Sequence, residues 1–293
     1  MNVKTLEEID FFRIREVVAD YCITTEGKNN FLQKLPISDS EQIDFFKKCG
    51  IEWTRYLNVL HATPLKYWEP IKNLLPIIRM NGASLTLEQV HALSQFCVSV
   101  RTLKESIEKH KIELELNILS AECEKLLDLS ETEKKIFRII TPDGQMKDLP
   151  EIAAIRQKIA ALNSKIKVIM HKYTSESKYS GILESTVPVL RGGRQVLAVK
   201  ASMQNRIPGL IYEVSASAQT VYIEPLAIGN MKVEIANLLN LEKEEIEKIL
   251  RELSNLLTTY DEELRVSFKT ICYIDNIFAR ATLAKSYNGS KPK

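Results

Sequence analysis

Glycine and proline are scarce in this chain, with 10 of each in 293 residues. This scarcity argues against a disordered or loop-rich protein, because such chains are enriched in both residues. No apolar run approaches the ~20 residues that a membrane-spanning helix needs, so no association with a membrane is expected. The opening residues, MNVKTLEEIDFF, turn acidic before any apolar core and do not resemble a secretory signal.

Cysteine and histidine are also sparse, and neither occurs in a metal-binding pattern. The five cysteines are scattered and never form C-x-x-C, which favours reduced thiols in a cytoplasmic protein over a disulfide framework or a zinc site: Cys22, Cys49, Cys97, Cys123 and Cys272. The four histidines show no H-E-x-x-H or other paired spacing. We therefore expect no metal site.

Motifs for catalysis are missing as well. The chain has no G-x-x-x-x-G-K-[ST] phosphate loop, no Rossmann fingerprint and no G-x-S-x-G nucleophile turn. Gly27-Lys28 is its only Gly-Lys pair, and Cys22 stands where the first glycine of a phosphate loop would be. We predict that this chain by itself holds no catalytic residue and no cofactor.

What the sequence does contain is a run of β-like sequence, residues 182–225, between two long stretches with helical periodicity. The flanking stretches, about 150–177 and 228–268, carry apolar residues in a 3,4,3,4 spacing that places an apolar seam on one helix face. The seam residues are Ile152, Ile155, Ile159, Leu162 and Ile166 before the β segment, and Ile246, Ile249, Leu253, Leu256 and Tyr260 after it. The spacing predicts two long helices that pack antiparallel, as in a coiled coil, and hold a small β tip.

Four short runs rich in Val, Ile, Leu and Tyr predict an antiparallel sheet in this tip: 182–190, 194–201, 209–214 and 220–224. Gly192-Gly193 gives a hairpin turn between the first two. The rest of the chain alternates helical runs with caps and turns. Thr24 or Thr25 can cap the helix that continues through Phe31, Pro150 suits the first turn of the helix that it opens, and Ser130–Glu133 has the spacing of a capping box. The fold class is therefore mainly α, with a helical core, long helices and one small antiparallel sheet.

A local basic patch lies in the β tip, although the net charge of the whole chain is only +2. Residues 191–206 contain four basic residues and no acid: Arg191, Arg194, Lys200 and Arg206. Strand alternation places Arg194 and Lys200 on one face. Such a patch can contact phosphates without reading the base sequence. The same stretch contains no aromatic residue, so base stacking is not expected. Equally, basic residues can simply keep an exposed sheet edge soluble.

Several separate blocks resemble the second type of bacterial MutS homologue, the branch with a C-terminal Smr nuclease domain. They are Arg191–Lys200 (RGGRQVLAVK), Ile207–Ile211 (IPGLI), Ser215–Pro225 (SASAQTVYIEP), Ile274–Ala284 (IDNIFARATLA) and Thr24–Lys28 (TTEGK). The blocks match in the right order over essentially the whole chain. The departures are Ala198 where the family usually has proline, Tyr212-Glu213 where it often has His-Asp, and Ala218 where glycine is usual.

The resemblance implies an N-terminal portion of such a protein, with a helical core at 1–149, levers and the end of the core at 150–178 and 227–288, and a nucleic-acid clamp at 179–226. The full-length family is a homodimeric ATPase and endonuclease that uses ATP and Mg²⁺, but those domains would lie outside this chain. The branch lacks the mismatch-reading domain of its mismatch-repair relatives. Family roles are to act on branched or recombination DNA and to rescue stalled, collided ribosomes.

Two hypotheses for this chain stay open. The first is a clamp that contacts double-stranded or branched DNA, or ribosomal RNA, through Arg191, Arg194, Lys200 and Arg206. The second is a coiled-coil scaffold whose β tip docks a protein or ribosomal partner. Salt dependence separates them, because phosphate contacts weaken steeply with salt and an apolar interface does not.

Overall fold

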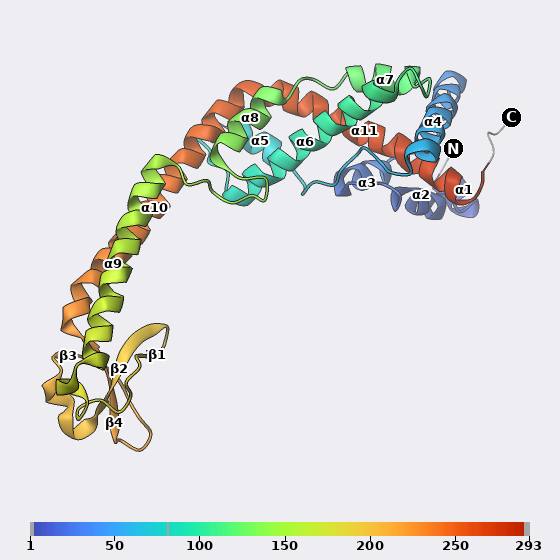
Figure 1. Cartoon of the computed structure of the whole chain (residues 1–293). Coiled ribbons are helices and arrows are strands. Elements are labelled where there is room, and N and C mark those ends of the chain that lie inside the picture. Colours follow the sequence, from blue (N-terminus) through green and yellow to red (C-terminus); the bar gives the residue numbers. More distant parts are fainter. Residues whose placement is uncertain (1–2, 81, 290–293) are drawn as a thin grey trace. The chain divides into compact units, whose positions relative to one another are not determined.

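The computed structural model describes residues 3–80 and 82–289 and divides the chain into two compact units (Figure 1). The first unit combines Met1–Lys147 with Ile249–Lys293, and the second is Asp148–Lys248. Strands that pair into a sheet occur only in the second unit among the described residues. The predicted class, mainly α with one small antiparallel sheet, is confirmed.

The first unit is helical. Its elements are α1 (Val3–Glu8), α2 (Phe11–Ala19), α3 (Thr25–Phe31), α4 (Ser40–Leu60), α5 (Leu74–Ile78), α6 (Leu87–His110), α7 (Asn117–Glu124), α8 (Ser130–Ile139), the end of α10 (Leu226–Leu257), a 3₁₀ turn (Thr258–Tyr260) and α11 (Asp261–Ser286). Trp53, Trp68 and Phe96 are among its largest fully buried side chains. Edge-to-face ring contacts join Trp53 to Phe278 and Trp68 to Phe96, at centroid distances of 5.2 and 5.5 Å.

Buried carboxylates satisfy backbone groups that the helices of this unit leave open. Glu52 on α4 accepts hydrogen bonds from the N–H groups of Ile118 and Leu119, in the first turn of α7. Glu26 accepts from the Trp68 indole and from the Ile71 N–H. A buried N–H without a partner costs about 1–3 kcal/mol. These two carboxylates therefore fix loops and helix ends that lack caps of their own.

In the second unit, α9 (Pro150–Ser175) leads through a 3₁₀ turn (Ser177–Tyr179) to a four-stranded antiparallel sheet, and α10 follows the sheet. The strands are β1 (Val189–Arg191), β2 (Arg194–Lys200), β3 (Gly209–Val214) and β4 (Thr220–Pro225), with a 3₁₀ helix at Ala201–Arg206 before β3. Their order across the sheet is β1-β2-β4-β3. A bulge at Tyr212 shifts the register between β3 and β4.

One hydrophobic cluster joins the sheet to both helices of this unit. It contains Ile166 and Met170 from α9, Leu197 and Val199 from β2, Val221 and Ile223 from β4, and Leu183, Ile207 and Ile228. Farther along, Arg156 of α9 is paired with Glu242 of α10 at 2.7 Å. Because Ile166 lies near the start of α10 and Arg156 near its later part, the two helices run antiparallel, side by side (Figure 1).

Three local predictions need correction. The first strand covers only Val189–Arg191, because Pro188 has no N–H to donate and Ser185 forms a tight turn with Val187. The second long helix ends at Leu257, and a 3₁₀ turn separates it from α11. The capping box at Ser130–Glu133 does not form, since Asp128 accepts the Ser130 N–H instead.

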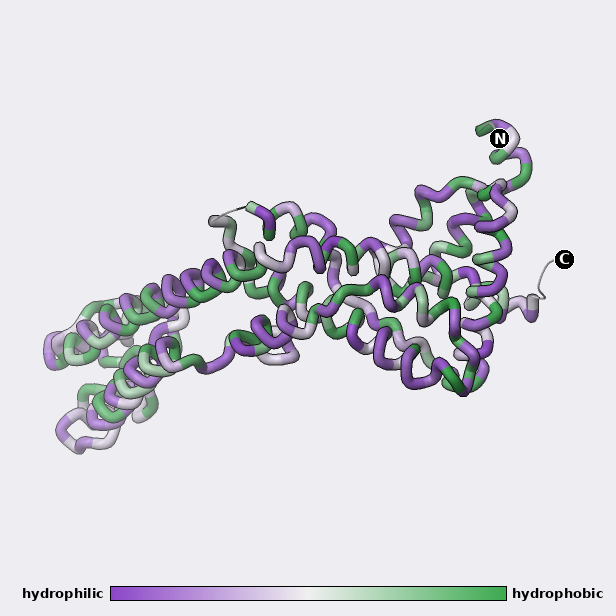
Figure 2. The backbone as a smooth tube through the Cα atoms, turned by 90° about the horizontal axis from the view of Figure 1, so that it is seen from above, coloured by the Kyte–Doolittle hydropathy of each residue, from purple (hydrophilic) through white to green (hydrophobic). Residues whose placement is uncertain are grey.

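Other local predictions are confirmed. The Thr24 side chain caps α3 by accepting the Gly27 N–H, and Pro150 occupies the first turn of α9. Apolar and polar residues alternate along the long helices, as Figure 2 shows by colour. The register of the second seam differs from the prediction, however. Leu250, Leu253 and Leu257 are the buried positions, whereas Leu256 is exposed. In the first seam, Ile159 is only half-buried, although its neighbours Ile155 and Leu162 are buried.

Candidate nucleic-acid interface

Arg191 and Arg194 flank the tight turn between β1 and β2 and lie opposite each other in the sheet. The turn residues Gly192 and Gly193 both adopt positive φ angles, 51° and 77°, which glycine tolerates without steric cost. A Cβ at Gly192 would lie 2.2 Å from the Tyr212 hydroxyl oxygen, so a side chain here would displace that ring. The two glycines therefore bring the two arginines together beside Tyr212.

The two arginines rest on tyrosine rings from neighbouring strands. The Arg191 guanidinium carbon lies 4.6 Å from the centroid of Tyr222, and Arg191 donates a 3.0 Å hydrogen bond to the hydroxyl of that residue. The Arg194 guanidinium carbon lies 5.6 Å from the centroid of Tyr212. The stretch 191–206 has no aromatic residue in sequence, but the fold supplies two from β3 and β4.

Carboxylates of β3 and β4 partly neutralise the two arginines. Glu213 lies 3.6 Å from Arg191, and Glu224 lies 3.5 Å from Arg194. Glu224 also forms a 2.8 Å ion pair with Lys232 of α10. The hydrogen bond to Tyr222 raises the pKa of Arg191 above its ordinary value. Both guanidiniums are thus held in place, but with less free charge than the sequence indicated.

Lys200 and Arg206 lie apart from this pair. Lys200 ends β2 opposite Thr220, roughly 20 Å from Arg194 at ~3.3 Å per strand residue. Arg206 ends the 3₁₀ helix and is exposed. Within the described residues, neither has a carboxylate within ion-pair distance. The structure brings together only two of the four predicted residues and leaves the other two free for an external anion.

Helix α9 carries further basic residues, which lie outside the predicted patch at 191–206. Three exposed lysines recur every seven residues along it: Lys158, Lys165 and Lys172. On a helix this spacing sets them about 10.5 Å apart along one face. Only Lys172 has a carboxylate nearby in the described part of the chain, Glu176 at 3.8 Å. A signal was available in the sequence, because residues 152–175 hold five basic residues and no acid.

Charge is therefore segregated within the second unit. Residues 152–206 contain ten basic and two acidic residues, whereas residues 207–248 contain three basic and seven acidic ones. The first group covers α9, β1, β2 and the 3₁₀ helix, and the second covers β3, β4 and α10. A near-neutral net charge of the chain hides this difference.

Other kinds of site find little support in the described residues. No helix there is long and apolar enough to cross a bilayer, and no group of three or more His, Cys, Asp or Glu side chains is placed to hold a metal ion. All five cysteines are free thiols. Burial raises the pKa of Cys22, Cys49 and Cys123 to about 12, so these thiols are protonated and unreactive at neutral pH.

Comparison with known proteins places the chain beside one group of enzymes. No family model matches the sequence. Proteins named endonuclease MutS2 match all of it: the one from Caldicellulosiruptor saccharolyticus is 27% identical over 298 residues, that of Clostridium acetobutylicum 28% over 301, and that of Agathobacter rectalis 29% over 308. In each case the chain spans 37% of the length of the relative. The predicted resemblance is confirmed over the whole chain.

Proposed function

We propose that the second unit is the nucleic-acid-contacting part of a MutS-like protein, with residues 179–226 as the clamp and α9 and α10 as its levers. The observation that carries the proposal is the set of solvent-accessible basic side chains Lys158, Lys165 and Lys172 of α9, with Lys200 and Arg206. Among the described residues only Lys172 of this set has a carboxylate within ion-pair distance. The similarity of the whole chain to part of the proteins named endonuclease MutS2 supports it. The same proposal holds that the whole protein binds ATP and Mg²⁺, has endonuclease activity and forms a homodimer.

The proposed ligand is the phosphodiester backbone. Lysines spaced along a helix and isolated basic residues on a sheet neutralise phosphates but do not read base edges. The faces of Tyr212 and Tyr222 lie under guanidiniums, and base stacking would have to displace those guanidiniums. Duplex or branched DNA and ribosomal RNA share this backbone, so binding is expected to be independent of base sequence.

The test is the salt dependence of binding by the lysine stripe. The variant Lys158→Ala/Lys165→Ala/Lys172→Ala should bind fluorescent duplex DNA, a four-way junction or purified ribosomes more weakly than the parent chain. Each lost phosphate contact removes about 0.9 from the slope of log K against log salt on duplex DNA, so the slope should fall by roughly 2–3 units. Arg194→Ala/Lys200→Ala should lower the slope by at most about 2.

The matched control removes three exposed lysines of the first unit: Lys66→Ala, Lys109→Ala and Lys269→Ala. This control should leave both affinity and slope unchanged. If the stripe variant and the control bind alike, the phosphate contacts lie elsewhere and the proposal fails. Phosphate contact predicts that the chain binds duplex DNA, the four-way junction and ribosomes. The ligand that binds most tightly among the three is the preferred one.

A second candidate function is protein docking through β3. This strand pairs with β4 alone, which leaves its other edge unpaired, and its apolar side chains are exposed: Leu210 by 61%, Ile211 by 49%, Tyr212 by 41% and Val214 by 51%. Exposed apolar edge strands bind partners by adding a strand. Binding of ribosomes that resists salt, and that a Leu210→Glu/Val214→Glu variant abolishes, would favour this function over phosphate contact.

A further inference from the structure

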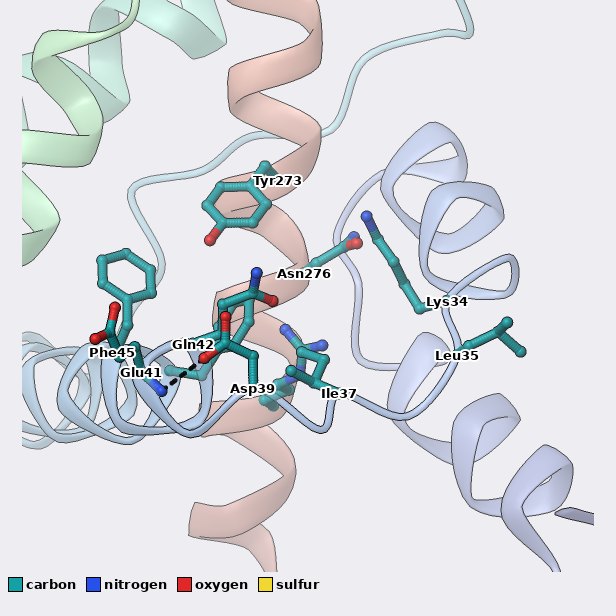
Figure 3. A pocket seen from close by; sticks show the side chains of 11 residues that line it. Lys34, Leu35, Ile37, Asp39, Glu41, Gln42, Phe45, Tyr273 and Asn276 are labelled. Carbon is teal, nitrogen blue, oxygen red and sulfur yellow. Dashed lines mark hydrogen bonds between the residues drawn. The ribbon is translucent and has the colours of Figure 1, made fainter. Parts of the chain in front are cut away.

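A cavity of about 630 Å³ lies in the first unit, between the start of α4, the loop before it and α11. Its lining includes Lys34, Phe45, Phe46, Tyr273, Asn276 and Arg280, with Asp39 and Glu41 also on its wall. Figure 3 shows the side chains of Lys34 and Asn276 extending toward the same part of the cavity. Cavities of roughly 300–1,000 Å³ hold small molecules.

Arg280 is the central feature of this cavity. Its guanidinium carbon lies 4.8 Å from the ring centroid of Phe31 and 4.4 Å from that of Phe46. Within the described residues it has no ion pair and no hydrogen bond. Its burial without a carboxylate lowers its pKa. A half-buried guanidinium whose five donors meet no protein acceptor is placed to bind an anion that enters the cavity.

Two more cations border the same region. Lys34 lines the large cavity and also a smaller one of about 230 Å³, which it shares with Arg280 and Arg15. The Nε of Arg15 is buried and has no hydrogen-bond partner in the described part of the chain. No carboxylate within that part pairs with Arg15, Lys34 or Arg280. Three basic groups around adjoining cavities are therefore not ion-paired, although Asp39 and Glu41 line the larger cavity.

Asn276 supplies an unused acceptor on the cavity wall. Its Nδ2 donates to the Gly27 carbonyl oxygen at 2.8 Å, which fixes the orientation of the amide. The Oδ1 atom is then buried and has no partner among the described residues. A buried acceptor of this kind fits a ligand that offers an N–H or O–H group.

We propose that this cavity binds a small phosphate monoester attached to a planar ring, a compound of mononucleotide size. The phosphate would bind Arg280 and Lys34, since two or more cations match its double charge better than the single charge of a carboxylate. The ring would lie against Phe45 and Tyr273, and a ring amine or hydroxyl would donate to Asn276. Asp39 and Glu41 on the wall disfavour a polyphosphate.

This proposal does not rest on the proposed clamp function, because the cavity and the clamp lie in different units. The probes are AMP, adenosine and inorganic phosphate, titrated into the 293-residue chain by calorimetry. AMP should bind in the micromolar to low millimolar range, inorganic phosphate at least about five-fold more weakly, and adenosine more weakly still. No heat from AMP up to millimolar concentrations would overturn the proposal.

Variants locate the binding. Lys34→Ala and Arg280→Lys should each weaken AMP binding by about five- to thirty-fold, because each removes a charge-assisted or bidentate contact to the phosphate. Lys48→Ala, on α4 but outside the lining, should bind AMP like the parent chain. Arg280 also packs between two rings, so Arg280→Lys could misfold. Lys34→Ala changes a half-buried and unpaired side chain and keeps the test valid in that case.

If Lys34→Ala binds AMP normally, the phosphate does not bind here. If inorganic phosphate binds as tightly as AMP, the cavity takes an oxyanion without a ring, and the proposed ligand class is wrong.

Discussion

At the scale of single residues, Gly27 shows how two distant parts of the sequence meet. A Cβ at this position would lie 2.1 Å from Asp275 Oδ2 and 2.8 Å from Thr24 Oγ1. Asp275 accepts hydrogen bonds from the N–H groups of Ile23 and Thr24 and from the Thr24 hydroxyl. The blocks Thr24–Lys28 and Ile274–Ala284 therefore interlock, and only glycine leaves room for the carboxylate.

Asp275 should make stability depend on pH. Burial, opposed by its three hydrogen bonds, raises its pKa from 3.8 to about 6. The folded state then binds a proton more tightly than the unfolded state, so this group favours folding below pH 4 and loses that contribution as pH rises to about 6. One pKa unit corresponds to about 1.4 kcal/mol, which gives a change of roughly 2–3 kcal/mol.

The measurement compares the parent chain with Asp275→Asn in urea unfolding at pH 4 and pH 7. The variant is expected to be less stable at both, because its amide group faces N–H donors. The stability difference between parent and variant should shrink by roughly 2–3 kcal/mol from pH 4 to pH 7. A difference that grows with pH would mean that the hydrogen bonds outweigh burial and that the pKa of Asp275 is depressed.

Ala218 adopts a left-handed backbone conformation that glycine favours. It lies in the turn between β3 and β4 with φ at 56°. Its N–H donates to the Ser215 carbonyl oxygen at 2.8 Å, so the turn is formed in spite of the Cβ. Left-handed backbone is strained for residues other than glycine.

Ala218→Gly should therefore stabilise the chain by about 0.5–1 kcal/mol, since relief of strain exceeds the added entropy of the unfolded state. Chemical denaturation of the two proteins measures the difference. Ala216→Gly in the same segment is the control, because Ala216 does not have a positive φ; it should destabilise by a similar amount. Equal effects of the two substitutions would show that φ at Ala218 is not strained.

At the scale of elements, periodicity predicted the long helices but not which residues they bury. The predicted seam of the second helix ran through Ile249, Leu253, Leu256 and Tyr260, while the buried residues are Leu250, Leu253 and Leu257. The shift arises because this part of α10 packs within the first unit, where Ser254 beside Leu253 accepts the Leu85 N–H at 2.9 Å. The 3,4,3,4 spacing assumes a single partner helix, and it does not predict the buried residues of a helix end that several elements surround.

Leu253 and Leu256 offer a matched pair for this register. Leu253 is 2% exposed and Leu256 is 38% exposed, on the same helix and three residues apart. Leu253→Ala should cost about 2–4 kcal/mol because it leaves a cavity. Leu256→Ala should cost less than about 1 kcal/mol. Thermal or urea unfolding checks the difference, and equal losses would restore the register predicted from the 3,4,3,4 spacing.

At the scale of the whole molecule, the first unit is discontinuous in sequence. It takes Met1–Lys147 and Ile249–Lys293, while Asp148–Lys248 forms the second unit and carries the sheet. The boundaries fall just before α9 and within α10, so the second unit includes most of the two long helices as well as the sheet between them.

The 293-residue chain should not hydrolyse ATP. Its only Gly-Lys pair lies inside α3, where the Gly27 N–H is bound to Thr24 Oγ1 and Lys28 is paired with Asp20 at 2.6 Å. Neither group is free to cradle a phosphate in the manner of a phosphate loop. Phosphate release from ATP with Mg²⁺ should match a protein-free blank. Turnover that persists through repurification and disappears in Lys28→Ala would contradict this expectation.

The sequence by itself determined the fold class, the approximate extent of the β segment, the Thr24 cap, the proline at the start of α9 and the resemblance to MutS2-type proteins. These features depend on local preferences and on residue order, which a single chain displays. Only the tertiary structure decided that Arg191 and Arg194 rest on tyrosines and face glutamates, and that Arg280 lies between two phenylalanines without an ion pair. The spacing of the α9 lysines is visible in the sequence, but their exposure is not. Each of these depends on contacts or exposure set by residues far apart in the chain, which spacing along one segment does not contain.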